Sequence, residues 1–357
     1  MQTAHSIIQR IAAIIAIFNN CLLIILIKCK SHRKVGKYKY LMIYISIFEI
    51  LYDVVDTFAA PTIFTKDSMF VVVVYADQEL VPFYFMETSV HLFCVFYGIS
   101  MAIFAIHFIY RFLVVSENNI VKKHNGKLIF GMLLFPILFG IFWFWVVNFF
   151  VAPFDKADDC LRENRLENMG LNISDVAYAG AYFWPIGADG HHHPHWKTFI
   201  GIFIMIVAIV VSFGLICFFG YKCYRQTKQM LQIASTQSAS FNKLQTQLFY
   251  ALVYQTVIPV FLMHVPASIG FSASFFNCSM EIFGEVSSVT ISFYPTLDPL
   301  PNFFVIKNYR EAICKGFQLF KRKVLQCKGS KVGVETAAAS ELASNGITSP
   351  PSVAPQN

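Results

Sequence analysis

Arg111 is a basic residue near the end of a long apolar segment. Residues Ser89–Ser116 are apolar enough to cross a bilayer, and His107 stands four residues before Arg111, so both lie on one face of a helix. An arginine inside a membrane segment is costly unless it has a partner or a task. We expect Arg111 to bind an acid or a carbonyl in one conformation and to leave it in another. The alternative is an arginine that anchors the helix by reaching the lipid headgroups.

Three carboxylates form a second candidate site in an earlier apolar segment. Glu49, Asp53 and Asp56 are spaced i, i+4, i+7, so they share one helix face. Three acids do not face lipid, so this face is expected to point into a helix bundle. One interpretation is an ion or proton site, shared with Asp298, that biases two states. The other is a water-filled cleft whose acids are partly protonated and hydrogen-bonded.

Polar residues at the opposite end of the Arg111 segment can line a ligand pocket. Glu87 and His91 lie four residues apart on one helix face. Ligand pockets are mostly apolar with a few polar groups that orient the ligand. The alternative for Glu87 and His91 is a rim of residues that bind loop water. The alternative for His264 and Glu285, which lie in later segments, is ordinary packing. The predicted ligand-binding residues are Tyr84, Glu87, His91, Tyr97, His264 and Glu285.

The composition is that of a membrane protein. The 357 residues are 56% hydrophobic and 14% charged, with a mean hydropathy of +0.55, whereas soluble domains hold about 25% charged residues. A bilayer core of about 30 Å is crossed by about 20 apolar residues. We therefore predict an all-α membrane protein, a seven-transmembrane helix bundle. The seven stretches are Ser6–Ile27, Tyr40–Ile63, Phe85–Val115, Leu128–Val151, Phe199–Gly220, Leu248–Phe271 and Ile282–Ile306.

The basic residues predict the orientation of this bundle. With the N-terminus outside, 22 of the 28 lysines and arginines lie inside, as expected of a membrane protein with an N-out, C-in topology. Asn172 and Asn277 each begin an Asn-x-Ser glycosylation triplet, and both then lie outside. Cys160 and Cys278 also lie outside. They can form a disulfide or remain free thiols, since pairing cannot be read from a sequence.

Two external segments carry further patterns. Residues 152–196 form the longest connection and end in the run HHHPHW. Four histidines in five residues do not easily reach one tetrahedral zinc ion, so a solvated loop is favoured and no metal or cofactor is expected. Met69–Tyr75 (MFVVVVY) is too short to span a membrane, and we predict a hairpin strand or a re-entrant turn.

The C-terminal part of the chain differs in composition. Asn308–Lys323 places apolar residues at helical spacing among basic ones, which predicts an amphipathic helix on the inner membrane surface, held by anionic lipid. We assign residues 1–328 to one membrane domain that includes this helix. Residues 329–357, rich in serine, alanine and proline, are predicted to be a disordered cytoplasmic tail.

Four stretches together resemble the nematode serpentine chemoreceptors of the Str class. These stretches are KVGKYKYLMIYISIFEILYDVVD, LFCVFYGISMAIFAIHFIYRF, KLQTQLFYALVYQTVIPVFLMHVP and FYPTLDPLPNFFVIKNYREAI, in that order along the chain. The resemblance implies a G-protein-coupled receptor in the plasma membrane, at the sensory cilium of chemosensory neurons. It also implies a small-molecule odorant or pheromone as ligand and a heterotrimeric G protein as partner.

The resemblance also assigns residues to activation. Position and motif favour the switch interpretation of Arg111, although Tyr110-Arg111-Phe112 replaces the Asp-Arg-Tyr triplet of rhodopsin-like receptors. Asp298-Pro299 replaces their Asn-Pro motif. Pro259 and Pro266 are expected to kink the sixth span. The residues predicted to act in activation or G-protein coupling are His107, Tyr110, Arg111, Asp298, Pro299, Tyr309 and Arg310.

Two other classes of membrane protein compete with the receptor hypothesis. A ligand-gated cation channel with seven spans of inverted topology disagrees with the distribution of basic residues. A proton-coupled secondary transporter could use the Glu49, Asp53 and Asp56 face as a relay. No nucleotide-binding loop, metalloprotease motif or nucleophile elbow indicates an enzyme, and nothing resembles a nucleic-acid-binding module.

Overall fold

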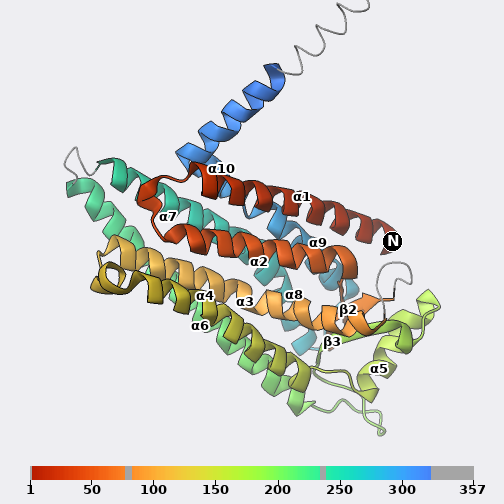
Figure 1. Ribbon diagram of the computed structural model, residues 1–357. Coiled ribbons are helices and arrows are strands. Elements are labelled where there is room, and N and C mark those ends of the chain that lie inside the picture. The colour runs from red at the N-terminus through yellow and green to blue at the C-terminus, as the bar shows by residue number, and fades with distance from the viewer. Residues whose placement is uncertain (1, 77–82, 234–238, 323–357) are drawn as a thin grey trace, which may run out of the picture. The chain divides into compact units, whose positions relative to one another are not determined.

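The chain forms a helical bundle with a small sheet at one end (Figure 1). The computed structural model describes residues 2–76, 83–233 and 239–322. The chain divides into two units, Met1–Tyr309 and Arg310–Asn357. The first unit contains the bundle and the sheet. Its main helices are α1 (Gln2–Lys30), α2 (Tyr38–Ala59), α3 (Phe83–Val115), α4 (Asn119–Phe150), α6 (Trp196–Ile233), α7 (Ala239–Pro259), α8 (Val265–Phe275), α9 (Glu281–Leu297) and α10 (Leu300–Val305).

Five helical stretches among the described residues are long and apolar enough to cross a membrane. The predicted second and seventh spans are not among them, because α2 carries Lys39 and three acids, and α9 is only 17 residues long. The membrane character of the prediction is thus confirmed, and the count of seven stays a prediction at this point. The five stretches are Ser6–Lys30, Phe85–Val115, Asn119–Phe150, Trp196–Gln232 and Phe241–Phe275.

Helix α3 is the centre of the bundle. In the most apolar stretch of α3, 67% of the residues are buried, whereas in the corresponding stretch of α6 only 17% are. The faces that α4 and α6 turn away from α3 expose large apolar side chains, including Phe130, Trp145 and Phe203. Apolar outer faces on helices with satisfied backbones are what a lipid environment requires. The bundle is therefore built to be surrounded by hydrocarbon.

Close packing of α3 on α4 depends on Gly98. A Cβ atom at this position would overlap the ring of Trp143, which is itself buried. Overpacking of this kind costs typically about 1–3 kcal/mol. We expect Gly98→Ala to lower the melting temperature of the purified protein. Gly131→Ala on α4 is the matched control, since a Cβ there meets nothing within 4 Å; equal melting temperatures for the two variants would contradict this packing.

The predicted all-α fold is wrong at one end of the bundle, which holds a three-stranded antiparallel sheet. Its strands are β1 (Thr62–Lys66), β2 (Met69–Tyr75) and β3 (Val176–Tyr182), in the order β1-β2-β3. The hairpin strand predicted at Met69–Tyr75 is confirmed. The second span was predicted to reach Ile63, but α2 ends at Ala59 because Ala60 takes a left-handed conformation (φ 40°).

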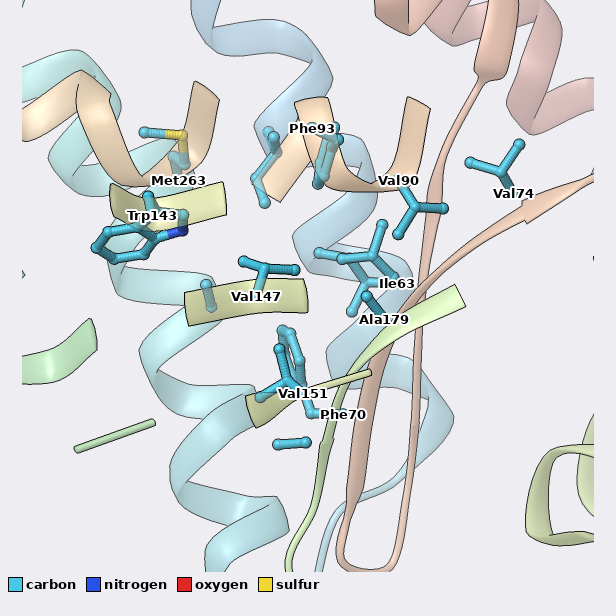
Figure 2. Packing of buried hydrophobic residues seen from close by; sticks show 14 of the residues in the cluster. Ile63, Phe70, Val74, Val90, Phe93, Trp143, Val147, Val151, Ala179 and Met263 are labelled. Atoms are coloured by element: carbon cyan, nitrogen blue, oxygen red, sulfur yellow. The ribbon is translucent and has the colours of Figure 1, made fainter. Parts of the chain in front are cut away.

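Both faces of this sheet are buried, which explains the uniformly apolar sequence of β2. Phe70, Val72 and Val74 face the helices, where Ile63 and Ala179 lie beside Val147 and Val151 (Figure 2). The alternate residues Val71 and Val73 pack on the other side against α5 (Asp155–Leu161) and the π-helical turn η2 (Arg162–Leu166). A strand buried on both faces reads as a continuous hydrophobic run. The sheet therefore covers the end of the bundle with two apolar layers.

The last two spans are both interrupted, and the interruption of the sixth falls at the prolines that predicted a kink. Helix α7 ends at Pro259 and is followed by a π-helical turn, η5 (Val260–His264), before α8 begins with Pro266 in its first turn. Between α9 and α10 the interruption falls at Asp298 and Pro299. A proline removes a backbone hydrogen bond and kinks a helix. We call α7, η5 and α8 together the segmented sixth helix.

Most of the predicted amphipathic helix belongs to the second unit. Helical structure runs through residues 307–322, and Phe317 and Phe320 are exposed beside Lys321 and Arg322. Lys323 and the predicted disordered tail, 329–357, lie outside the described residues. Binding of this helix to lipid stays a prediction.

The predicted pair of Cys160 and Cys278 is not formed in the structure, where both residues are free thiols. The Cys160 sulfur accepts a hydrogen bond from Asn164 Nδ2 (3.6 Å), and burial raises the pKa of this thiol. The Cys278 thiol donates to the carbonyl oxygen of Ala273 (3.4 Å). Each sulfur is thus engaged within its own segment.

Candidate functional site

A cavity of about 300 Å³ lies between the helices and the sheet. Its walls come from α3, α4, α6, α8, α9 and all three strands, and they are almost entirely apolar. None of the described residues that line it is charged, and those with a polar group in the side chain are Cys94, Tyr97, Trp143, Ser268 and Ser272. Burying an unpaired charge in such a site is very costly, whereas apolar surface gains from burial. The cavity fits a small uncharged molecule with few polar groups.

The structure separates the residues that the sequence predicted as ligand contacts. Tyr97 lines the cavity, and Glu87, His91 and Glu285 do not. The His91 ring lies against Phe144 (5.2 Å between centroids), and its Nδ1 is 2.8 Å from the Glu87 carbonyl oxygen. Glu87 and Glu285 are exposed. The side chain of Tyr84 lies outside the described residues.

His264 lies directly behind Tyr97. Their ring centroids are 4.9 Å apart, and His264 Nε2 is 3.4 Å from the Ser100 hydroxyl. His264 is buried and is the last residue of η5. A side chain that lines the cavity is thus in contact with the interruption of the segmented sixth helix.

Arg111 is held at the opposite end of α3 from the sheet. Its side chain is 1% exposed, and its Nη1 and Nη2 donate to the side-chain and main-chain oxygens of Gln245, both at 2.6 Å. The guanidinium also lies over the Tyr38 ring, 5.1 Å from its centroid. A guanidinium that is buried with these partners does not fit the alternative, in which the arginine reaches the lipid headgroups. The predicted carbonyl partner is present, and it belongs to α7. We call this contact the Arg111–Gln245 latch.

Tyr38 contacts two other predicted switch residues, Tyr110 and His107, as well as Arg111. Its ring stacks on Tyr110 (5.8 Å, 7°), and its hydroxyl is 3.4 Å from His107 Nδ1. Tyr110 in turn donates to Asn125 Oδ1 at the start of α4 (3.1 Å). Sequence reasoning missed Tyr38 and Gln245, although both fall inside the motifs that carry the family resemblance.

The three intramembrane acids of α2 are buried, and one of them, Glu49, meets the interruption between α9 and α10. Glu49 is in hydrogen-bonding contact with Asp298 and with Asn20 of α1. Gln255 of α7 donates to Asp298, and Asn302 donates to Gln255 (3.1 Å). Two carboxyls can hydrogen-bond to each other only by sharing a proton. The network therefore connects α1, α2, the segmented sixth helix and the last span.

The remaining predicted residues lie around this network and beyond it. Asp53 and Asp56 are each 1% exposed, and Asp56 contacts Ser292. Pro299 is the N-cap residue of α10. The Tyr309 hydroxyl is 2.6 Å from that of Ser31, so the segment that follows α10 contacts the residue that follows α1. Arg310 belongs to the second unit.

Comparison with known proteins places these features in one family. A profile described as "Serpentine type 7TM GPCR chemoreceptor Str" matches residues 5–314. The chain is 34% identical to the G-protein coupled receptor str-217 of Caenorhabditis elegans, over 86% of this chain and 88% of that protein. It is 25% identical to the serpentine receptor class r-10 of the same organism, over 82% and 85%. The chain belongs to the Str family of serpentine seven-transmembrane G-protein-coupled chemoreceptors.

Proposed function

We propose that this receptor binds a small uncharged odorant or pheromone in the cavity and activates a heterotrimeric G protein. One observation carries the proposal: the segmented sixth helix lines the cavity with α8, contacts the cavity residue Tyr97 through His264, and forms the Arg111–Gln245 latch through α7. Ligand site and switch thus act on one helix. Membership of a receptor family argues against the channel and transporter alternatives.

The proposed mechanism is a shift between two conformations. A ligand changes such an equilibrium only by its difference in affinity for the two states. Contact with Tyr97 alters the packing of His264, and the π-helical turn at Pro259 lets α7 rotate relative to α8. Rotation of α7 carries Gln245 away from Arg111. The freed Arg111, with Tyr110 and His107, then meets the G protein.

The polar network around Asp298 gives the same helix a second point of control. Gln255, one of its members, lies on α7 between the latch and Pro259. Rotation of α7 therefore has to break or rearrange the hydrogen bonds of Gln255 to Asp298 and Asn302. We propose that this network sets the resting position of α7, and that ligand binding in the cavity moves α7 away from that position.

The proposal requires the sheet end outside the cell and the latch at the cytosol, in a plasma membrane such as that of a sensory cilium. The excess of basic residues on the latch side supports this orientation, as does the exposed Asn172 beside the sheet. The helix over 307–322 would then lie on inner-leaflet lipid, next to the G protein.

Glycosylation of Asn172 tests this orientation. We expect the receptor expressed in animal cells to migrate faster on a gel after treatment with an N-glycosidase, because the sheet end faces the lumen during synthesis. Asn172→Gln should remove all or part of this shift, and the remainder should disappear when Asn277→Gln is added. A second readout is an epitope tag fused to the N-terminus, which antibodies should reach in intact cells. Unchanged migration after glycosidase treatment, together with a tag that antibodies cannot reach in intact cells, would contradict the orientation.

A ligand screen tests the function itself. Reporter cells that express the receptor and a promiscuous G protein are exposed to volatile esters, ketones and alcohols, and to ascarosides with and without a free carboxylate. We expect the agonists to be uncharged, because none of the described residues that line the cavity carries a positive charge to pair with a carboxylate. Activation by charged members of the panel alone would place the ligand site elsewhere.

A further inference from the structure

The cavity reaches the surface on one side of the bundle. Ile206 and Val210 of α6 line it, and they are 50% and 62% exposed. Ser268 and Ser272 of α8 line it from the other side and are exposed as well. Side chains that belong both to the cavity wall and to the outer surface mark an opening. It lies between α6 and α8, and we call it the lateral opening.

The sheet end of the cavity is closed. Phe70, Val72 and Ala179 form this wall, and at most 7% of each is exposed. Behind them the opposite face of the sheet packs against α5 and η2. A water-borne molecule coming from this side would have to separate paired strands and two apolar layers.

An aromatic cluster closes the gap between α6 and α8 at their sheet ends. The Phe199 ring of α6 lies 5.8 Å from that of Phe275, which ends α8. Phe183 contacts both rings, and Trp184 donates from Nε1 to the Phe275 carbonyl oxygen (2.7 Å). The lateral opening therefore does not extend to the sheet end of the two helices.

The lateral opening lies at the depth of the hydrocarbon core. Ile206 and Val210 follow Trp196, the first residue of α6, by about 15 and 21 Å at a rise of 1.5 Å per residue. The core of a bilayer is about 30 Å thick. A molecule in the lipid would meet the opening directly.

We propose that ligands enter the cavity sideways from the bilayer, through the lateral opening. This inference rests on the proposed function in that the cavity is taken as the ligand site. The ligand class is then a lipophilic, uncharged molecule that first partitions into lipid. Its concentration in the membrane, rather than in water, sets the rate of binding.

The test measures how fast an uncharged probe reaches the cavity. The full-length receptor in lipid nanodiscs is mixed with 3-trifluoromethyl-3-phenyldiazirine and photolysed at increasing times, and labelling of Phe93 and Tyr97 is quantified by mass spectrometry. Val210→Trp and, separately, Ser272→Trp place a large side chain in the opening from either helix. We expect each to lengthen the half-time of labelling at least tenfold while the plateau stays within twofold.

Val211→Trp is the matched control, since Val211 is 56% exposed but does not line the cavity. It should label like the wild type, and lipid-facing Phe18 on α1 should label equally in every variant. Equal half-times for Val210→Trp and Val211→Trp would overturn the proposal. A lowered plateau with an unchanged half-time would also overturn it, because that result means a filled cavity. Labelling needs neither an agonist nor a G protein, so its outcome is independent of whether the chain signals.

Discussion

Gln245→Ala is expected to raise signalling in the absence of any ligand. The substitution removes the side-chain oxygen that accepts from Arg111 Nη1 and leaves the main-chain acceptor in place. A hydrogen bond to a charged group contributes about 1.5–3 kcal/mol. Since about 1.4 kcal/mol changes an equilibrium tenfold, the active fraction should rise about tenfold or more. The measurement is basal G-protein activation at matched surface expression.

Two further variants serve as controls for Gln245→Ala. Lys243→Ala alters an exposed residue on the same helix and should leave basal activity unchanged. Arg111→Ala should abolish signalling while surface delivery persists, because the proposal gives Arg111 a direct role at the G protein. If Gln245→Ala signals no more than Lys243→Ala without ligand, the contact between Arg111 and Gln245 is not a latch.

Ala267→Phe is expected to abolish the response to an agonist found in the ligand screen. Ala267 is 1% exposed and lines the cavity, so a phenyl ring there occupies the space of a ligand. The expected loss of potency is at least a hundredfold, measured as a dose–response curve at matched surface expression. The added ring fills an existing void, so the protein should still fold.

The controls for this prediction are residues that the sequence proposed as ligand contacts. His91→Ala and Glu87→Gln change polar groups outside the cavity lining and should leave potency within about threefold. A full response from Ala267→Phe, together with a large loss in either control, would return the ligand site to the start of α3.

The sequence predicted the helices well because their signal is local. An apolar run of about 20 residues and a proline each act over a few turns, so the apolar spans and the interruption at Pro259 were foreseeable. The sheet was harder to predict because β3 pairs with β2 across more than a hundred residues of chain. The sequence of β3, VAYAGAY, carries little strand signal of its own. Nothing in it predicts the register that places Val72 opposite Ala179.

The candidate site was predictable only where polar residues mark it. Arg111, Glu49 and Asp298 stand out in apolar surroundings, and the structure gives each a buried polar partner. The cavity is different, since Val147 or Ala267 looks like any core residue until the fold leaves space beside it. Glu87 and His91 attracted attention by their chemistry, whereas the residues that line the cavity are mostly apolar.

The receptor that carries both Ala267→Phe and Gln245→Ala tests most directly whether occupation of the cavity acts by opening the latch. Basal and agonist-evoked G-protein activation are measured in the same reporter cells at matched surface expression. We predict the raised basal activity of Gln245→Ala together with no further response to agonist. A double variant that is silent at rest, or one that still responds to agonist at wild-type potency, would contradict the coupling of cavity and latch through the segmented sixth helix.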